Sequence, residues 1–441
     1  MATIFAPATA AGKAGVAVVR ISGESAAAAL TALCGHLPEP RVATRRDLCD
    51  PANGERLDDG LVLWFPGPRS FTGEDVAELH IHGSRAVVES ILAVLGGLPG
   101  LRLAKPGEFA RRAYAAGKLD LAQIEALADL IAAETRAQAR QALRQLGGAL
   151  GSVVEELRVA ILRLRAQAEA EIDFPDEGDV PGGLIAALAP SLGLLDEKLG
   201  RLIADATRGE RLRNGYTVAI LGPPNAGKSS LLNRLAQREA AIVSAVAGTT
   251  RDTIEIHLDV AGWPVTLIDT AGLRDPGELG EPHAALEAEG MRRTRLSAEQ
   301  ADLRLIVLDA QTPDPDPMLV PFLVDALVVH NKIDLAPAGP GAVGVSAATG
   351  AGIEALVALL ADKAAAALGA SDGQAAVVTR ARHRDALVAV QVALRRARSQ
   401  PQAELVAEEL RGAADALGRI VGRTGVEDVL DLLFGEFCIG K

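Results

Sequence analysis

Apolar and polar positions show two different periodicities along this chain. Before about residue 117, short apolar runs such as 16–21 and 76–82 have the length and alternating faces of strands, with turn residues between them. From about Leu119, apolar residues recur every three or four positions, which predicts helices to about 212 and again from 381 to 434. Between these helical stretches, apolar runs that end in Gly-rich or acidic tetrapeptides predict an open α/β sheet.

The pattern therefore predicts a multidomain protein that combines α+β and α/β architecture. The two helical stretches are expected to form one discontinuous helical domain, with the α/β domain inserted between them, because the chain ends of compact domains often lie close together. The predicted segments are an α+β domain over 1–117, a first helical segment over 118–212, an α/β domain over 213–370 and a second helical segment over 371–441.

A Gly-rich loop at 222–230 carries the most specific chemical signal. It reads G-x-x-x-x-G-K-S, follows the apolar strand 216–221 and opens a helical pattern. Backbone N–H groups in such a loop can surround a phosphate chain, as can those of the helix that follows. Lys228 is expected to reach the β- and γ-phosphates, and the Ser229 hydroxyl to bind Mg²⁺.

Three further tetrapeptides predict the base and the γ-phosphate contacts. Residues 331–334 read N-K-x-D after an apolar run, and the Asp334 carboxylate can accept from the paired N–H groups of guanine, which adenine lacks. Residues 269–272 read D-T-A-G after a strand, which places Asp269 near Mg²⁺ and Gly272 near the γ-phosphate. Residues 346–348 end a short strand and would back the base. The motifs together predict a GTPase.

The residue that would orient the attacking water is not evident. Leu273 follows the D-T-A-G segment and can neither position water nor stabilise charge. Asn225 in the loop, with G-T-T-R-D at 248–252, resembles the potassium-activated GTPases of the TrmE-Era-EngA type, in which K⁺ takes the place of an arginine finger and two GTPase domains meet face to face. The alternative is that Asn225 only stabilises the loop.

Composition limits the kinds of partner and the cellular location that we expect for this protein. A net charge of −12 argues against a large nonspecific nucleic-acid surface, although Arg136, Arg140 and Arg144 share one helix face. A solvated face is the favoured interpretation of these arginines, and RNA contact the alternative. The three cysteines have no C-x-x-C spacing, which fits a reducing cytosol, and no apolar run is long enough for stable membrane insertion. The expected location is cytoplasmic.

His80 and His82 lie two apart on a predicted strand and so share one face. A metal pair is one interpretation, but no third ligand is near in sequence, so hydrogen bonding or packing is favoured.

Several flanking segments make the resemblance more specific. They are R-I-S-G at 20–23, S-F-T-G-E-D-V at 70–76, P-G-E-F at 106–109, G-K-L-D-L at 117–121 and C-I-G-K at 438–441. With the GTPase motifs, they resemble the MnmE (TrmE) family of tRNA modification GTPases over the whole chain. The resemblance implies a tetrahydrofolate-binding-like α+β first domain and a Ras-like P-loop GTPase domain inserted in the helices.

The resemblance also implies a function. It predicts a K⁺-stimulated GTPase that acts with the FAD-dependent protein MnmG (GidA) to add an aminomethyl-type (carboxymethylaminomethyl) group to C5 of uridine 34 in certain tRNAs. It implies a homodimer, a larger assembly with MnmG, and 5-formyl-tetrahydrofolate or a related folate as the one-carbon source. The matching folate-binding positions are Arg20, Glu78, Lys118 and Lys441.

For hydrolysis, the resemblance implies Lys228 and Glu287 as catalytic residues, with Glu281 and Glu289 as alternatives to Glu287 because 275–285 is lengthened. Ser229 and Thr250 would bind Mg²⁺, and Asn225, Ser244, Val246 and Thr249 would surround K⁺. The full predicted GTP-binding set is Asn225, Ala226, Gly227, Lys228, Ser229, Ser230, Ser244, Ala245, Val246, Ala247, Gly248, Thr249, Thr250, Asp269, Thr270, Ala271, Gly272, Asn331, Lys332, Asp334, Ser346, Ala347 and Ala348.

Two other functions are weighed. A regulatory GTPase switch in ribosome assembly would need an RNA-binding module such as a KH domain, and none is evident in this acidic sequence. A folate-binding scaffold with a decayed GTPase conflicts with intact Lys228, Asp269 and Asp334. Cys438 is interpreted as an ordinary cysteine, because no base is evident to activate it.

Overall fold

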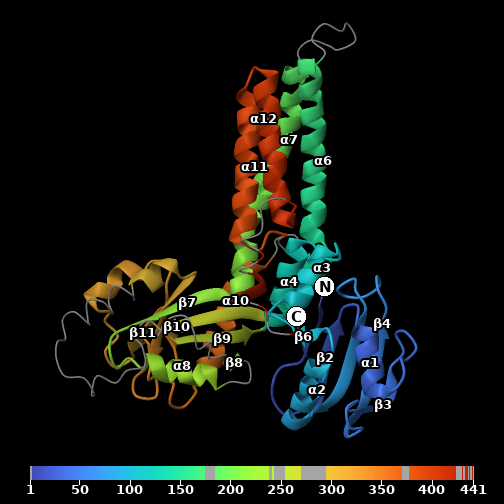
Figure 1. Ribbon diagram of the computed structural model, residues 1–441. Coiled ribbons are helices and arrows are strands. Elements are labelled where there is room, and N and C mark those ends of the chain that lie inside the picture. The colour runs from blue at the N-terminus through green and yellow to red at the C-terminus, as the bar shows by residue number, and fades with distance from the viewer. Residues whose placement is uncertain are drawn as a thin grey trace, which may run out of the picture. The chain divides into compact units, whose positions relative to one another are not determined.

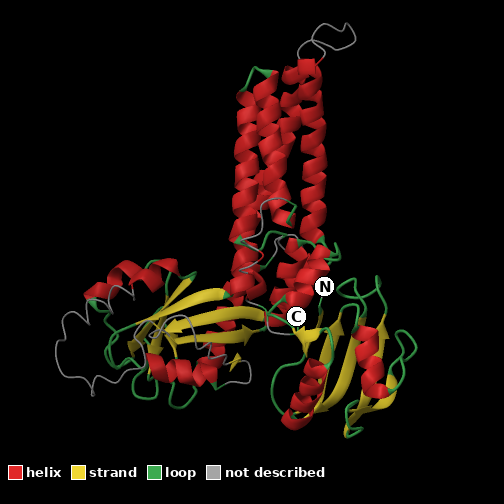
Figure 2. Ribbon diagram, viewed as in Figure 1, coloured by secondary structure: helices red, strands yellow, loops and turns green. Residues whose placement is uncertain are grey.

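The computed structural model describes residues 2–173, 184–237, 241–242, 254–269, 295–369, 377–423, 430, 433–435, 437 and 440. The chain divides into two compact units. Figure 1 shows the chain coloured by residue number, and Figure 2 shows it coloured by secondary structure. Unit 1 comprises Met1–Ala128, Leu146–Arg158 and Asp415–Lys441, and unit 2 comprises Asp129–Gln145 and Val159–Ala414. Each unit is built from segments that are distant in sequence.

Unit 1 contains a six-stranded sheet in the order β3-β4-β5-β2-β1-β6. Only the β1–β6 pair is parallel. Buried and more exposed side chains alternate along β5, as in a sheet with one buried face. Leu79 and Ile81 are buried in the core, while His80 and His82 point to the other face. The strands are β1 (Thr3–Pro7), β2 (Ala14–Ser22), β3 (Thr44–Cys49), β4 (Arg56–Phe65), β5 (Val76–Gly83) and β6 (Leu101–Leu103).

Helices complete unit 1. Apolar residues of α1 (Ala26–Cys34) and α2 (Arg85–Gly97) share one core with the buried face of the sheet. Leu121 and Ile124 of α4 (Leu121–Ala132) pack with Ala110 of α3 (Glu108–Ala115) and with Phe434 and Phe437 from the end of the chain. The C-terminal residues that are described therefore pack in the first unit.

Unit 2 combines long helices with a second sheet. The segments with a 3.6-residue apolar period form helices α5 (Arg136–Leu146), α6 (Ala149–Asp173), α7 (Leu184–Asn214), α11 (Ala381–Ser399) and α12 (Ala403–Val421). Helices α4, α6 and α12 are each divided between the two units: residues 129–132 of α4 belong to unit 2, and Leu146 of α5 belongs to unit 1. Helices α7 and α11 pack together, and Arg395 of α11 pairs with Asp196 of α7 at 3.0 Å. The predicted helical stretches are confirmed where the chain is described. Among those residues, no helix is long and apolar enough to cross a bilayer.

The sheet of unit 2 has seven strands in the order β13-β12-β11-β7-β10-β9-β8. Strands β13, β12, β11, β7 and β10 are parallel, and their central members are nearly continuous apolar runs because both faces are covered. The strands are β7 (Tyr216–Leu221), β8 (Ala241–Ile242), β9 (Ile254–Val260), β10 (Trp263–Asp269), β11 (Leu303–Asp309), β12 (Leu327–Asn331) and β13 (Val343–Gly344), with helices α8 (Lys228–Ala236) and α10 (Ile353–Leu368) and the short helix η2 (Pro317–Phe322).

Strands β2, β5 and β7 lie where the apolar runs 16–21, 76–82 and 216–221 predict them, β3 was not predicted because its sequence is mostly polar, and the mixed α+β and α/β architecture is confirmed. The predicted domain boundaries near residues 117, 212 and 370 remain predictions.

Candidate functional site

The Gly-rich loop joins the central strand β7 to helix α8 and passes very close to its neighbours. A Cβ on Gly222 would lie 2.2 Å from the Val307 carbonyl oxygen, and one on Gly227 would lie 2.2 Å from Asn331 Nδ2. Both glycines also have positive φ, +153° and +87°. The two glycines of the motif are therefore required by close packing and by backbone conformation together.

Lys228 begins α8 and is 9% exposed. Its ammonium donates to the carbonyl oxygens of Gly222 and Pro223, at 2.9 Å each, so it is folded over the loop. Burial lowers the pKa of Lys228, while the charge of Asp269 acts to raise it. Asp269 is fully buried at the end of β10, the parallel neighbour of β7. The charges predicted to face the phosphates and Mg²⁺ thus lie at adjacent strand ends.

Asn331, at the end of β12, connects three loops of the predicted site. Its Nδ2 donates to the Ala226 carbonyl oxygen at 2.9 Å, and its Oδ1 accepts from the Ala347 N–H at 3.0 Å. The side chain is 2% exposed. Asn331 therefore fixes the Gly-rich loop and the 346–348 segment relative to the N-K-x-D segment.

The other residues of N-K-x-D are positioned by carboxylate and hydroxyl groups. Lys332, with φ of +66°, places its ammonium 2.7 Å from Asp309 Oδ2, and this hydrogen bond lowers the pKa of Asp309. Asp334 is exposed, and its Oδ1 accepts from the Ser346 hydroxyl at 2.5 Å. A carboxylate held in this way and open to solvent can accept a pair of N–H donors. Asp309 was missed from sequence, although its place at the end of a parallel strand was a usable signal.

The remaining loop residues surround this core of the site. Asn225 is exposed in the left-handed conformation, with φ of +62°. Ser229 and Ala347 are half-buried, Ser230 and Ala348 are exposed, and Ala226 is buried. A hydroxyl at the first turn of α8 and a buried carboxylate at the end of β10 are oxygen ligands of the kind that Mg²⁺ prefers, so the donor set fits that ion.

Much of the predicted hydrolytic site lies outside the described residues, and its roles stay predictions. This holds for Ser244, Ala245, Val246, Ala247, Gly248, Thr249, Thr250, Thr270, Ala271, Gly272, Leu273, Glu281, Glu287 and Glu289. The predicted folate-binding residue Lys441 and the cysteine Cys438 also lie outside the described residues.

In unit 1, the structure brings three of the four predicted folate-binding residues to one region. Arg20 on β2 and Glu78 on β5 are direct cross-strand partners, with Arg20 Nε and Nη2 at 3.0 and 2.9 Å from Glu78 Oε1. The Arg20 guanidinium also lies 5.4 Å from the centre of the Phe71 ring. Lys118 is exposed and donates to the Pro68 carbonyl oxygen at 2.5 Å. Both basic groups therefore contact the loop that contains S-F-T-G-E-D.

A buried polar network behind that loop was not predicted. Arg112 is 8% exposed, and its guanidinium contacts Glu74 at 2.9 Å and Glu108 at 3.1 Å. The Ser22 hydroxyl lies 2.7 Å from both the Thr72 hydroxyl and Glu74 Oε2. The network anchors the loop to β2 and α3, so its residues are positioning groups for the candidate folate site.

The two histidines of β5 hydrogen-bond to carboxylates, as favoured from the sequence. His80 Nε2 lies 3.3 Å from Glu78 Oε2, and His82 Nδ1 lies 2.7 Å from Asp58 Oδ1. Among the residues described, no cluster of three His, Cys, Asp or Glu side chains could hold a metal ion. Arg136, Arg140 and Arg144 are all exposed on α5, as their four-residue spacing predicts.

Comparisons with known proteins match the whole chain. Residues 3–118 match the family model described as GTP-binding protein TrmE N-terminus, and residues 121–438 match the MnmE helical domain. The chain is 54% identical to the tRNA modification GTPase MnmE of Parvibaculum lavamentivorans over 447 residues, with 100% of each chain covered. It is 52% identical to that of Rhodospirillum rubrum over 460 residues, with 100% and 99% covered. The chain belongs to the MnmE (TrmE) family of tRNA modification GTPases.

Proposed function

We propose that this protein hydrolyses GTP and couples hydrolysis to modification of C5 of uridine 34 in certain tRNAs. The observation that carries the proposal is the connection that Asn331 makes between the phosphate loop, the N-K-x-D segment and the 346–348 segment. Family membership adds the tRNA substrate class. The product is a carboxymethylaminomethyl-type group, and the proposed partner in the reaction is the FAD-dependent protein MnmG (GidA).

The described residues have separate tasks in GTP binding. Loop N–H groups and the start of α8 bind the phosphates, and Lys228 turns from the Gly222 and Pro223 carbonyls towards them. Asp334, held by Ser346, accepts from guanine. Ser229 and Asp269, with Thr250, hold Mg²⁺, which neutralises charge on the phosphates when bound.

Hydrolysis needs a further cation and a group that positions water. We assign the cation to K⁺, held by Asn225 at the exposed tip of the loop together with Ser244, Val246 and Thr249. Glu287 positions the water. Because Leu273 can do neither task, these residues or a partner must supply both.

The first 117 residues are proposed to bind 5-formyl-tetrahydrofolate or a related folate. Arg20 and Lys118 supply positive charge, Glu78 accepts from the donor groups of the pterin, and Lys441 joins them. Since Glu78 Oε1 is held by Arg20 and Oε2 lies near His80, the pterin would share Glu78 with these neighbours. This segment also mediates the proposed homodimer, to which MnmG binds in a cytoplasmic assembly. The other proposed parts of the chain are the first helical segment over 118–212, the GTPase domain over 213–370 and the second helical segment over 371–441.

The first test is steady-state GTP hydrolysis in K⁺ and then in Na⁺ at equal ionic strength. K⁺ is expected to accelerate turnover, Asn225→Ala to abolish that response, and Glu287→Ala to be slow in either salt. Asn233→Ala, an exposed asparagine on α8, is the matched control and should behave as the parent. Equal rates in both salts would contradict the K⁺ assignment, and absence of hydrolysis in the parent would contradict the proposed function.

A further inference from the structure

Within unit 2, the chain passes twice between the helices and the nucleotide-binding region, defined here as residues 215–369. It enters this region after α7, at Arg213 and Asn214, and rejoins the helices at 377–380, before α11. One carboxylate oxygen contacts both crossings. Asp129 Oδ1, near the end of α4, accepts from Arg213 Nε at 2.8 Å and from Arg380 Nη2 at 2.7 Å.

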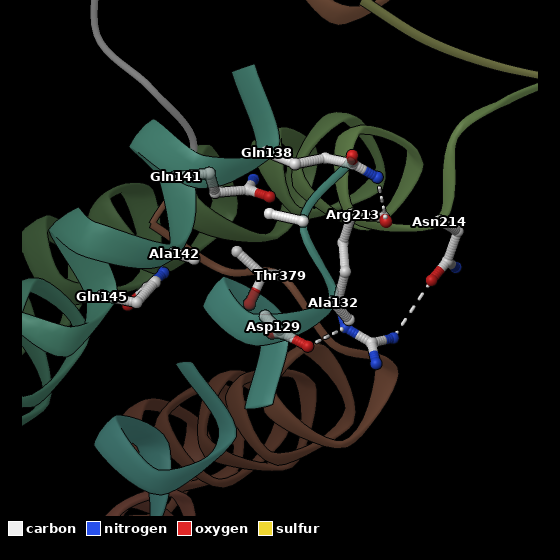
Figure 3. A pocket seen from close by; sticks show the side chains of 10 residues that line it. Asp129, Ala132, Gln138, Gln141, Ala142, Gln145, Arg213, Asn214 and Thr379 are labelled. Atoms are coloured by element: carbon white, nitrogen blue, oxygen red, sulfur yellow. Dashed lines mark hydrogen bonds and ion pairs between the residues drawn. The ribbon is translucent and has the colours of Figure 1, made fainter. Parts of the chain in front are cut away.

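Helix α5 holds the backbone of the same two crossings. Gln138 and Gln141 donate to the carbonyl oxygens of Arg213 and Gly209, at 3.0 and 3.2 Å, and Gln145 donates to that of Val377. The three glutamines are three and four residues apart, so they lie on one face of the helix. Figure 3 shows them with Asp129 and Arg213 around a common space.

The start of α5 and the residues just before it contact the sheet of unit 2. Ala137 of α5 is buried in the sheet's apolar core, and its N–H donates to the Gly262 carbonyl oxygen at 3.4 Å. Glu134 lies 3.7 Å from His257 of β9. Gly262 is in the turn between β9 and β10, and β10 ends at Asp269 beside Lys228. Helix α5 thus contacts both the crossings and the strand pair that leads to the nucleotide site.

The space between these groups is a pocket of about 110 Å³ with both polar and apolar walls. It is lined by Asp129, Gln141, Gln145, Arg213 and Thr379, with small alanines between them. Gln145 is 6% exposed, and its Oε1 accepts no hydrogen bond from any described residue. A pocket of this size and polarity can hold a few water molecules. The contacts that hold the crossings to Asp129 and α5 on this side are charged and polar, whereas Ala137 of α5 and Leu212 of α7 supply apolar packing against the sheet.

We propose that Asp129 is a positioning residue that couples the nucleotide-binding region to the helices. Its charge holds both crossings beside α5, so a change at the nucleotide site is passed to the helices of unit 2. Asparagine keeps the size of the side chain but removes the charge that two guanidinium groups share. The inference deepens the proposed function and rests on it only for the activity measurement described last.

The structural test uses spin labels on the full chain. Cysteines replace Leu359 on α10 and Val392 on α11, both exposed, after Cys34, Cys49 and Cys438 are changed to Ser. Distances between the labels are measured by pulsed electron paramagnetic resonance with GDP and with a non-hydrolysable GTP analogue. We expect Asp129→Asn to broaden the distance distribution and to remove its response to nucleotide, and Asp129→Glu to restore part of both.

Asp196→Asn is the matched control. Asp196 also pairs with an arginine between helices α7 and α11, and its side chain is 22% exposed against 18% for Asp129, but it lies away from the crossings. It should leave the distribution unchanged. If Asp129→Asn does not fold, Arg380→Gln removes one of the two donors and should broaden the distribution in the same way. A distribution as narrow as the parent's in a folded Asp129 or Arg380 variant overturns the proposal.

The activity measurement compares GTP hydrolysis with tRNA modification in the presence of the partner protein and a folate. Asp129→Asn should leave the hydrolysis rate near the parent's and lower the modification obtained per GTP by about 2- to 30-fold. Equal loss of both activities, or of neither, overturns the coupling role. If the parent itself modifies no tRNA, the proposed function fails, whereas the label distances measured without turnover still test Asp129.

Discussion

Asn331 allows the candidate nucleotide site to be tested through its stability as well as its affinity. Asn331→Ala removes the hydrogen bonds to the Ala226 carbonyl oxygen and from the Ala347 N–H. Asn331 and Ala226 are 2% and 1% exposed, so the Ala226 carbonyl left behind is shielded from water, whereas Ala347 is half-buried. A buried polar group without a partner costs about 1–3 kcal/mol, so loss of the partner of the Ala226 carbonyl alone should lower the free energy of unfolding of this region by about 1–3 kcal/mol.

The chain offers a local reporter for this loss. It contains two tryptophans: Trp64 lies in the sheet of unit 1, and Trp263 begins β10 and packs against the core of the nucleotide-binding region. In a Trp64→Phe background, denaturant unfolding followed by Trp263 fluorescence reports on that region alone. This matters because a chain of several domains does not unfold in a single two-state transition. Asn331→Ala should move the Trp263 transition to lower denaturant and weaken binding of a fluorescent GDP.

Asn331→Asp separates the two hydrogen bonds. It keeps an acceptor for the Ala347 N–H but places a carboxylate oxygen against the Ala226 carbonyl, so it should also destabilise the site. Asn233→Ala, on the exposed face of α8, should change neither the Trp263 transition nor the GDP affinity. If Asn331→Ala leaves both the transition midpoint and the GDP affinity at the parent's values, the three loops are not held by this side chain and the reasoning is refuted.

Three further predictions follow from other contacts. Gly227→Ala places a methyl group 2.2 Å from Asn331 Nδ2 at a φ of +87°, so it should weaken GDP binding and lower the Trp263 midpoint; unchanged affinity would refute the packing argument. Asp334→Asn removes an exposed charge and should lower GTP affinity about 10- to 100-fold in nucleotide titrations while the midpoint stays constant, because hydrogen bonds to charged groups are worth about 1.5–3 kcal/mol. Burial acts to raise the pKa of Glu108, but hydrogen bonds from Arg102, the Lys105 N–H and Arg112 outweigh it and lower the pKa to about 2. The stability that Glu108 contributes is therefore present above its ordinary value of 4.5 and is lost as the pH falls towards 2. Unfolding of unit 1 followed by Trp64 should show this loss, and Glu108→Gln should flatten it; an equally steep pH dependence in the variant would count against the assignment.

The fold around the candidate nucleotide site could be predicted from sequence because its signals are local. The run 326–329 is apolar because its strand lies inside a sheet covered on both faces, and the polar residues that follow it, such as Asn331, must lie at the carboxyl edge of the sheet. The ends of parallel strands meet there, so the positions of Lys228, Asp269 and Asp334 follow from the order of motifs. The spacing of the alanines and leucines likewise predicted the helices, since each buried face needs an apolar residue every three or four positions.

Side-chain contacts could not be predicted where one buried or half-buried polar side chain joins distant segments. Asp129 contacts Arg213 and Arg380, which are 84 and 251 residues away, and Arg112 contacts Glu74, 38 residues away. In sequence, Asp129 is one acidic residue on an amphipathic helix, and a solvated side chain is its ordinary interpretation. Only the fold brings two arginines to it, and a pattern of apolar spacing contains no information about which charges will meet.

Asn331 and Asp129 show the same principle at two levels of the molecule. Each is a short side chain that serves several backbone or guanidinium groups at once: Asn331 joins three loops of the nucleotide site, and Asp129 joins the two chain crossings. A short side chain has few rotamers, so fixing it costs little entropy, and each segment that it binds is held at a defined distance from the others. When one of these segments is displaced, such a residue passes the displacement to the others. If nucleotide chemistry near Lys228 and Asp269 is to move the helices, groups of this kind can pass the displacement on, together with the apolar contacts that Ala137 and Leu212 make with the sheet, because each holds separate segments at defined distances.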